Sequence, residues 1–210
     1  LLAERAGVRV LPVVVAGRSA EGDAVLVTHA PGGASLADMS PGDVADELLD
    51  EIWAQVSALH AAGIAHGRID GSRIVLDANG ELALTDFGEA GLSTERRDLM
   101  FDRARLLAAT ALASDASRAV ASAKRMIGTD GLVEVLPFLQ PAVLDHDTRA
   151  KIDAGEWDVK ALRTTACAAA GVEVPDLEQL RRVSVRSLVQ TAIIILLTYT
   201  LISLFSGVDF

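Results

Sequence analysis

The sequence predicts an α+β fold that begins with a small antiparallel sheet, becomes mainly helical, and is followed by one transmembrane helix. Three observations lead to this prediction. Two valine-rich runs at residues 8–15 and 24–29 lie close together, which is typical of a strand pair. Apolar residues then recur at helical spacing from Val44 onwards. Finally, residues 188–205 contain no Asp, Glu, Lys or Arg.

The first predicted element is a hairpin made by residues 8–15 and 24–29. Residues 17–23 between them contain two glycines and several short polar residues, which favour a loose turn. The run Pro31-Gly-Gly33 is then expected to break the sheet, because both residue types are disfavoured inside strands.

A long amphipathic helix is predicted next. Ser40, Pro41 and Asp43 combine a capping hydroxyl, a proline suited to the first turn and an acid three residues after the cap, so we expect the helix to begin there. Gly63 is expected to end it. Its apolar positions are Val44, Leu48, Leu49, Ile52, Val56 and Leu59.

A second, smaller hairpin and a set of helices complete the soluble part. Residues 73–77 and 81–85 flank Asn79 and Gly80, a pair that supplies the positive φ angles of a tight turn. Alanine-rich sequence with helical spacing then predicts further helices at residues 99–114, 116–127, 130–139 and 148–170.

The apolar segment at residues 188–205 is long enough to cross a bilayer. Its 18 residues span roughly 27 Å as a helix, close to the thickness of the hydrocarbon core. Three arginines, Arg181, Arg182 and Arg186, precede it, whereas only Asp209 follows, so the positive-inside rule predicts that residues 1–187 are cytoplasmic at a cell membrane. A buried helix of a soluble core and a polybasic lipid-binding site are the alternatives.

The overall charge argues against one large class of partner, nucleic acid. The net charge is −10 and the isoelectric point about 4.8, with no cluster of Lys and Arg before residue 181, so nucleic acid is not expected as a partner. Cys167 is the single cysteine, which excludes an intramolecular disulfide.

Around the small hairpin, the sequence combines residue types that serve phosphoryl transfer. His66 belongs to a loop that continues through Arg68 to Asp70, and Asp86-Phe87-Gly88 follows the second strand. This order resembles the catalytic core of the protein kinase-like superfamily. In that family, a His-x-Asp loop supplies a base, an Asn five residues after the Asp holds a metal, and an Asp-Phe-Gly turn holds Mg²⁺.

The resemblance implies a truncated protein kinase-like fold, with the end of an N-lobe and a mainly helical C-lobe. Thr28, His29 and Ala30 align with the hinge whose backbone meets adenine, and Asp86, Phe87 and Gly88 with the turn at the nucleotide. It assigns Asp86 as a metal ligand. The residues alone establish no cofactor; ATP and Mg²⁺ are what the resemblance implies for a full-length protein. The glycine-rich loop and the lysine strand would precede Leu1, so we expect the chain to be a fragment.

Two arginines stand where the family has catalytic groups. Arg68 lies at the base position, and Arg73 replaces the second metal ligand. An arginine stays protonated, so it neither accepts a proton nor binds a cation. Asp70, two places from the base position, is a carboxylate that offers a substitute base. We interpret His66 as architectural, packed against the phenylalanine of the turn, and Asp102 as the helix aspartate that anchors the loop, with an exposed helical acid as the alternative.

Later segments resemble one bacterial family of large integral membrane proteins. In that family, a kinase-like cytoplasmic region precedes a polytopic domain of the lysylphosphatidylglycerol synthase or flippase-like type. The segments that carry the resemblance are residues 102–112, 136–141, 171–175 and 180–188. The organisation it implies is N-lobe strands and hinge at 1–36, a C-lobe at 37–170, a juxtamembrane linker at 171–187 and a transmembrane helix at 188–205.

Three functions follow from these patterns. The first is a non-catalytic, pseudokinase-like module that regulates or scaffolds a lipid-handling membrane domain, its partners being the lipid bilayer and the downstream transmembrane domain. The second is an active ATP-dependent kinase of small molecules or lipids with an atypical catalytic loop. The third is a membrane-anchored protein kinase. Arg68 and Arg73 favour the first function.

Overall fold

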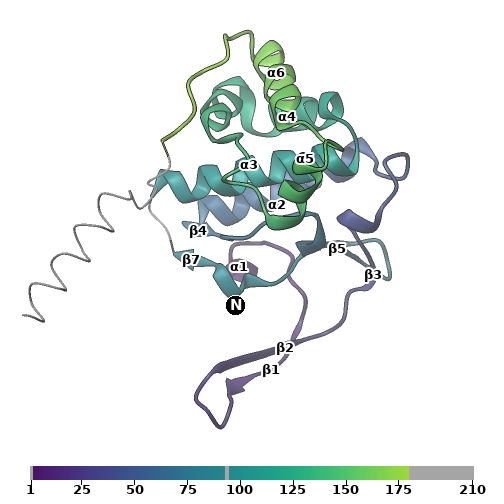
Figure 1. Ribbon diagram of the computed structural model, residues 1–210. Helices are drawn as coiled ribbons and strands as arrows, with labels where there is room; N and C mark the ends of the chain where they lie inside the picture. The colour runs from purple at the N-terminus through teal and green to yellow at the C-terminus, as the bar shows by residue number, and fades with distance from the viewer. Residues whose placement is uncertain (1, 93–94, 180–210) are drawn as a thin grey trace, which may run out of the picture. The chain divides into compact units, whose positions relative to one another are not determined.

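A computed structural model describes residues 2–92 and 95–179, and the fold is α+β as predicted. The chain divides into two compact units, Leu1–Leu177 and Glu178–Phe210. The first unit begins with the short helix α1 (Leu2–Arg5), continues through small antiparallel sheets, and then becomes helical (Figure 1). In the described part of the chain, no helix has the length and apolarity needed to cross a membrane. The span expected at 188–205 lies outside the described residues.

The predicted first hairpin is present as β1 (Val13–Arg18) and β2 (Ala24–Thr28), which pair antiparallel. Its turn closes through the Ser19 amide, which donates to the Asp23 carbonyl at 2.8 Å. The expectation of a strand from residue 8 is wrong for residues 8–12. Val8 is instead buried beside the helices at 2% exposure, and Val10 makes an isolated bridge to Leu84, because this stretch packs on the core.

The β1–β2 ribbon exposes its apolar side chains on both faces. Figure 1 shows it projecting away from the helices of the unit. Six valines and leucines are 40–60% exposed, namely Val13, Val14, Val15, Val25, Leu26 and Val27. Two-stranded hairpins are marginally stable alone in water, so the sequence gives this ribbon little stability of its own.

The long helix α2 (Asp46–Ala61) begins later than expected. Ser40 does not cap it: the Asp43 amide donates to the Ser40 carbonyl at 2.9 Å in a separate turn, and Ala45 is the N-cap. The chain turns there because Val44 is drawn into the core at 1% exposure. Gly63 follows the end of the helix with a φ of 71°, as expected. The buried face is Leu49, Ile52, Trp53, Val56, Leu59 and His60.

The second hairpin is confirmed as β5 (Ile74–Asp77) and β6 (Leu82–Leu84). The Asp77 carboxylate accepts hydrogen bonds from the amides of Asn79 and Glu81, both at 2.8 Å, which fixes the turn. The expected break at Pro31-Gly-Gly33 is confirmed for the first sheet, since β2 ends at Thr28 and the next strand, β3 (Gly32–Ser35), belongs to a separate sheet in which it pairs with β5. Gly33 permits this approach: a Cβ there would lie 2.5 Å from the Leu76 carbonyl oxygen.

The helical part contains α3 (Arg96–Ala113), α4 (Ala116–Val135), α5 (His146–Asp153) and α6 (Val159–Ala170). Helix α4 packs against α2, α3 and α6, and Gly128 interrupts it with a φ of 74°. The helical sequence expected at 148–170 is present, but as two helices rather than one continuous run. A turn that includes Gly155, with a φ of 73°, separates α5 from α6, and the side chain of Asp158 caps α6.

Short elements place the loops that carry the candidate site. They are η1 (Leu36–Asp38), β4 (Ile64–Ala65), η2 (Gly71–Arg73), η3 (Phe87–Glu89), β7 (Gly91–Leu92) and η4 (Leu136–Phe138). Strand β4 pairs with β7, so the loop that follows β4 lies beside the segment that follows Asp86. This pairing brings both halves of the predicted motif to one place.

Candidate functional site

The loop from His66 to Asp70 is fastened to helix α3 by one buried carboxylate. Asp102 has no exposed surface. It accepts hydrogen bonds from the amides of His66 at 2.6 Å and Gly67 at 3.0 Å. Its Oδ2 also lies 3.3 Å from His60 Nε2. The interpretation of Asp102 as a loop anchor is therefore confirmed, and the alternative of an exposed helical acid is wrong.

Arg105 reinforces this attachment one turn further along α3. It donates to the Gly67 carbonyl and, through Nε, to the Val143 carbonyl at 2.7 Å. Gly67 also packs so closely on the Glu89 carbonyl that no Cβ fits at that position, and its φ is +80°. Sequence reasoning missed Arg105 and His60. The three-residue spacing of Arg105 from Asp102 is the signal that places both on one helix face.

His66 is buried inside the loop, next to the phenylalanine of the Asp-Phe-Gly turn. Its side chain is fully buried, its Nε2 donates to the Thr85 carbonyl at 3.0 Å, and its ring lies 4.7 Å from that of Phe87. Burial lowers the pKa of His66, and the nearby Asp102 carboxylate opposes this shift. The neutral ring carries its proton on Nε2, since that atom donates to a carbonyl.

The lowered pKa of His66 predicts that acid weakens the fold. Below its usual pKa of about 6.5, histidine takes up a proton in the unfolded chain while buried His66 stays neutral. The unfolded state then binds more protons, so the free energy of unfolding falls as the pH drops from about 6.5 towards the folded-state pKa. Urea unfolding across pH 8 to 5 measures this slope. A His66→Phe variant is expected to show a smaller slope, and an equal slope would contradict the assignment.

Arg73 occupies the centre of the predicted site. Its Nε donates to Asp86 Oδ2 at 2.9 Å, and its Nη1 donates to Asp70 Oδ2 and to Ser72 Oγ, the latter at 3.1 Å. The guanidinium is 13% exposed. One side chain therefore bonds both carboxylates that sequence reasoning considered for metal binding and base catalysis.

Asp70 is held in place on both of its oxygens. Its Oδ1 accepts from the amide of Ser72 at 2.9 Å and from the hydroxyl of Ser72 at 2.6 Å, and its Oδ2 accepts from Arg73. This geometry is that of a side-chain cap on η2. A carboxylate with both oxygens engaged by protein donors has little capacity left to take a proton from an acceptor molecule.

Asp86 starts the turn with an unusual backbone. Its φ of 57° and ψ of 62° place it in the left-handed region, which non-glycine residues seldom adopt, and it is the single non-glycine residue with positive φ in the described part of the chain. Its side chain is 52% exposed and leans onto Arg73. The positive charge of Arg73 therefore offsets the negative charge of Asp86 at the start of the turn. The next residue, Phe87, packs on the ring of His66.

Arg68, at the position of the base, faces solvent. It is 53% exposed and lies 3.4 Å from Glu89, which is 60% exposed. A pair this exposed contributes little to stability. Because a guanidinium does not accept a proton, Arg68 supplies no base in this position.

Mg²⁺ does not fit the residues present. Arg73 lies between the carboxylates of Asp70 and Asp86, and its guanidinium already bonds one oxygen of each. No cluster of three or more His, Cys, Asp or Glu suitable for a metal occurs among residues 2–92 and 95–179. A cation placed there would meet the positive charge of Arg73, so we derive no metal-dependent step.

The residues predicted to form a hinge lie at and just after the end of β2. Thr28 is its last residue, and the chain leaves the strand through His29 and Ala30, all three exposed. The amide of His29 donates to the Pro12 carbonyl at 2.9 Å, so it is already engaged within the hairpin.

No protein-family model matches the sequence, and a search of curated proteins gives no match either.

Proposed function

We propose that this chain is a non-catalytic, pseudokinase-like cytoplasmic module of a polytopic membrane protein of the flippase or lipid-handling type. In this proposal the soluble part has the truncated kinase-like fold implied by the sequence motifs. It regulates or scaffolds the membrane domain that the apolar segment 188–205 introduces, with the lipid bilayer and that domain as its partners.

One observation carries the proposal: Arg73 bonds Asp70 and Asp86 at once. In a phosphoryl-transfer site, metal ions neutralise the phosphate charge and a carboxylate accepts the proton. Here a fixed guanidinium takes the place of the metal, and the single alternative base is held by Arg73 and Ser72. In this proposal the Arg73 guanidinium stabilises the turn at Asp86, which a metal ion and a nucleotide would stabilise in an active kinase.

The anchoring contacts explain why such a site would be retained without activity. Asp102 and Arg105 bind the backbone of the loop rather than its reactive positions, so they maintain its shape independently of chemistry. A loop kept rigid in this way is suited to presenting a surface to another domain. The membrane location rests on the apolar segment and the arginines that precede it.

Measurement of ATP turnover tests the proposal directly. We expect purified full-length protein to show no Mg²⁺-dependent ATP hydrolysis or transfer above that of its Asp86→Ala variant, because Asp86 holds Arg73 rather than a metal. An Asp70→Asn variant is likewise expected to show the same ATP hydrolysis or transfer as the parent protein. Turnover that is abolished by Asp70→Asn but kept by Arg68→Ala would instead support the active kinase with a displaced base.

A further inference from the structure

The β1–β2 ribbon has two backbone edges that pair with no strand in the described part of the chain. Strand β1 follows Pro12, changes register between Val13 and Val15, and ends on a charged residue, Arg18. A proline, an irregular register and a charge all discourage further pairing at the edge of a sheet. Strand β2 has none of these features, because its five residues, Ala24–Thr28, are uncharged and the extra residue lies on β1. The edge of β2 is therefore the unprotected one.

The hydrogen bonds at the two ends of the ribbon show which residues of β2 direct their backbone outward. The Ser19 amide donates to the Asp23 carbonyl, and the His29 amide donates to the Pro12 carbonyl. Inward and outward directions alternate along an antiparallel strand, so the odd-numbered residues from 23 to 29 bond towards β1. The even-numbered residues direct their amide and carbonyl groups to the free edge, namely Ala24, Leu26 and Thr28.

The free edge of β2 is complementary to a second copy of itself. If two β2 strands pair antiparallel about a two-fold axis at Leu26, Ala24 of each copy lies opposite Thr28 of the other. The two Leu26 residues then lie opposite each other, so every outward-facing residue of the strand has a partner. Each of these pairs exchanges two hydrogen bonds. A shift of the register by two residues would lose one of the pairs.

The same register also matches the side chains. Val25 of one copy lies opposite Val27 of the other, on the face that Val27 shares with Val15, and Val25 and Val27 are 40% and 45% exposed. Asp23 of one copy lies opposite His29 of the other, which places a carboxylate beside an imidazole N–H at both ends of the pairing. Neither of these two side chains has a hydrogen bond or ion pair with any residue that the structure describes. The edge therefore provides apolar contact and complementary charge together.

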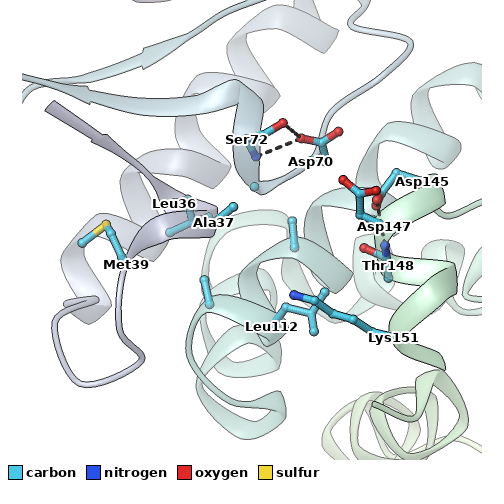
Figure 2. A pocket seen from close by; sticks show the side chains of 13 residues that line it. Leu36, Ala37, Met39, Asp70, Ser72, Leu112, Asp145, Asp147, Thr148 and Lys151 are labelled. Atoms are coloured by element: carbon cyan, nitrogen blue, oxygen red, sulfur yellow. Dashed lines mark hydrogen bonds between the residues drawn. The ribbon is translucent and has the colours of Figure 1, made fainter. Parts of the chain in front are cut away.

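The unused groups of the ribbon distinguish it from the small cavity between α3 and α5 (Figure 2). In that cavity Asp70 accepts a hydrogen bond from Ser72, and Asp145 accepts one from Thr148, so both carboxylates are already engaged within the chain. At the β2 edge, the outward-facing backbone groups have no partner among residues 2–92 and 95–179.

We propose that this chain associates with a second copy of itself through the free edge of β2. The two-stranded ribbons of both copies then form one antiparallel sheet of four strands. A sheet of three or more strands has the stability in water that a lone hairpin lacks. The contact uses one short edge from each copy, so it belongs among the smaller specific interfaces, and we expect a dissociation constant in the micromolar range. Dimerisation is independent of the proposed function, because it needs neither the Arg73 site nor the membrane segment.

Cysteine cross-linking of the full chain in detergent micelles tests the register. Every chain carries Cys167→Ala, so that the introduced cysteine is its one thiol. Val25→Cys mixed with Val27→Cys, on chains with tags of different size, is expected to form a heterodimeric disulfide. Residues opposed in this way lie about 4.5 Å apart at Cα, which is within reach of a disulfide. The matched control is Val15→Cys mixed with Val27→Cys, which is expected to cross-link at least about tenfold less, because Val15 lies on β1, away from the paired edge.

A charge exchange at Leu26 tests whether this edge drives association. Leu26 is 60% exposed, so a charge there leaves the fold of the chain intact. Leu26→Lys and Leu26→Glu each place like charges opposite each other and are expected to raise the dissociation constant about tenfold, as measured by sedimentation equilibrium. An equimolar mixture of the two is expected to restore the dimer. Leu92→Lys, at a position on β7 that is 76% exposed, is the control and is expected to have no effect.

Three results would overturn the proposal. They are a monomeric chain throughout the micromolar range, equal cross-linking of the two cysteine mixtures, and equal effects of Leu26→Lys and Leu92→Lys. A monomer whose Ala24, Leu26 and Thr28 amides resist hydrogen exchange would overturn it as well, and would identify another segment of the same chain as the group that covers the edge.

Discussion

Replacement of Asp102 by alanine is expected to lower the free energy of unfolding by about 3–5 kcal/mol, the range for removing one partner from a buried charged network. The carboxylate has no exposed surface and accepts the amides of His66 and Gly67. After the replacement, these donors face a cavity with no acceptor, at a cost of about 1–3 kcal/mol for each unsatisfied group. Urea unfolding followed by circular dichroism measures the loss.

Two matched variants separate lost hydrogen bonds from lost volume. Asp102→Asn keeps the shape but replaces one acceptor oxygen with a donor, so we expect it to retain most of the destabilisation. Asp153→Ala, on exposed helix α5, is expected to change stability by no more than about 0.5 kcal/mol. A parent-like unfolding midpoint for Asp102→Asn would show that the carboxylate fills space rather than anchoring the loop.

Local chemistry made several elements predictable. Asn79 and Gly80 specify a tight turn through their tolerance of positive φ, and the strands β5 and β6 form on either side. The valine-rich runs likewise give β1 and β2, because the strand preference of β-branched residues and a glycine-containing turn act over short distances. These features depend on neighbouring residues alone, so a single sequence carries them.

The errors arose where distant packing overrode a local signal. Ser40 and Pro41 have the composition of a helix start, but burial of Val44 bends the chain and moves the first turn to Asp46. Residues 8–12 have the composition of a strand, but Val8 is buried and Val10 only bridges Leu84. In both cases the deciding partner is remote in sequence, and no local pattern reveals it.

The contact between Arg73 and Asp86 was partly predictable, because it joins residues that are distant in sequence but are brought together by a predicted hairpin. The residues are 13 positions apart, but the hairpin register pairs Ile74 with Leu84, which brings the residues just outside the two strands together. The Thr85 amide donates to the Arg73 carbonyl at 2.9 Å and confirms this closeness. The predicted hairpin therefore contained the signal for an ion pair, although sequence reasoning treated the two residues only as separate site positions.

Replacement of Arg73 by asparagine is expected to create a divalent cation site. The change releases Asp86 Oδ2 and Asp70 Oδ2 from the guanidinium and adds an amide oxygen beside them. Carboxylate and amide oxygens are the ligands that Mn²⁺ and Mg²⁺ prefer. Removal of a unit positive charge at about 4 Å is worth several kcal/mol at the effective dielectric of a protein surface. We therefore expect Mn²⁺ affinity to rise at least tenfold, as measured by electron paramagnetic resonance of free Mn²⁺.

The choice of control decides what this gain means. Arg68→Asn removes an equal charge from an exposed neighbour that pairs with Glu89 rather than with Asp86, so it is expected to leave Mn²⁺ affinity near that of the parent. The double variant Arg73→Asn with Asp86→Ala is expected to lose the gain, since Asp86 is then absent as a ligand. If Arg68→Asn raised the affinity as much as Arg73→Asn, the effect would be a general change of charge. Arg73 would then not be the group that stands in the place of the metal.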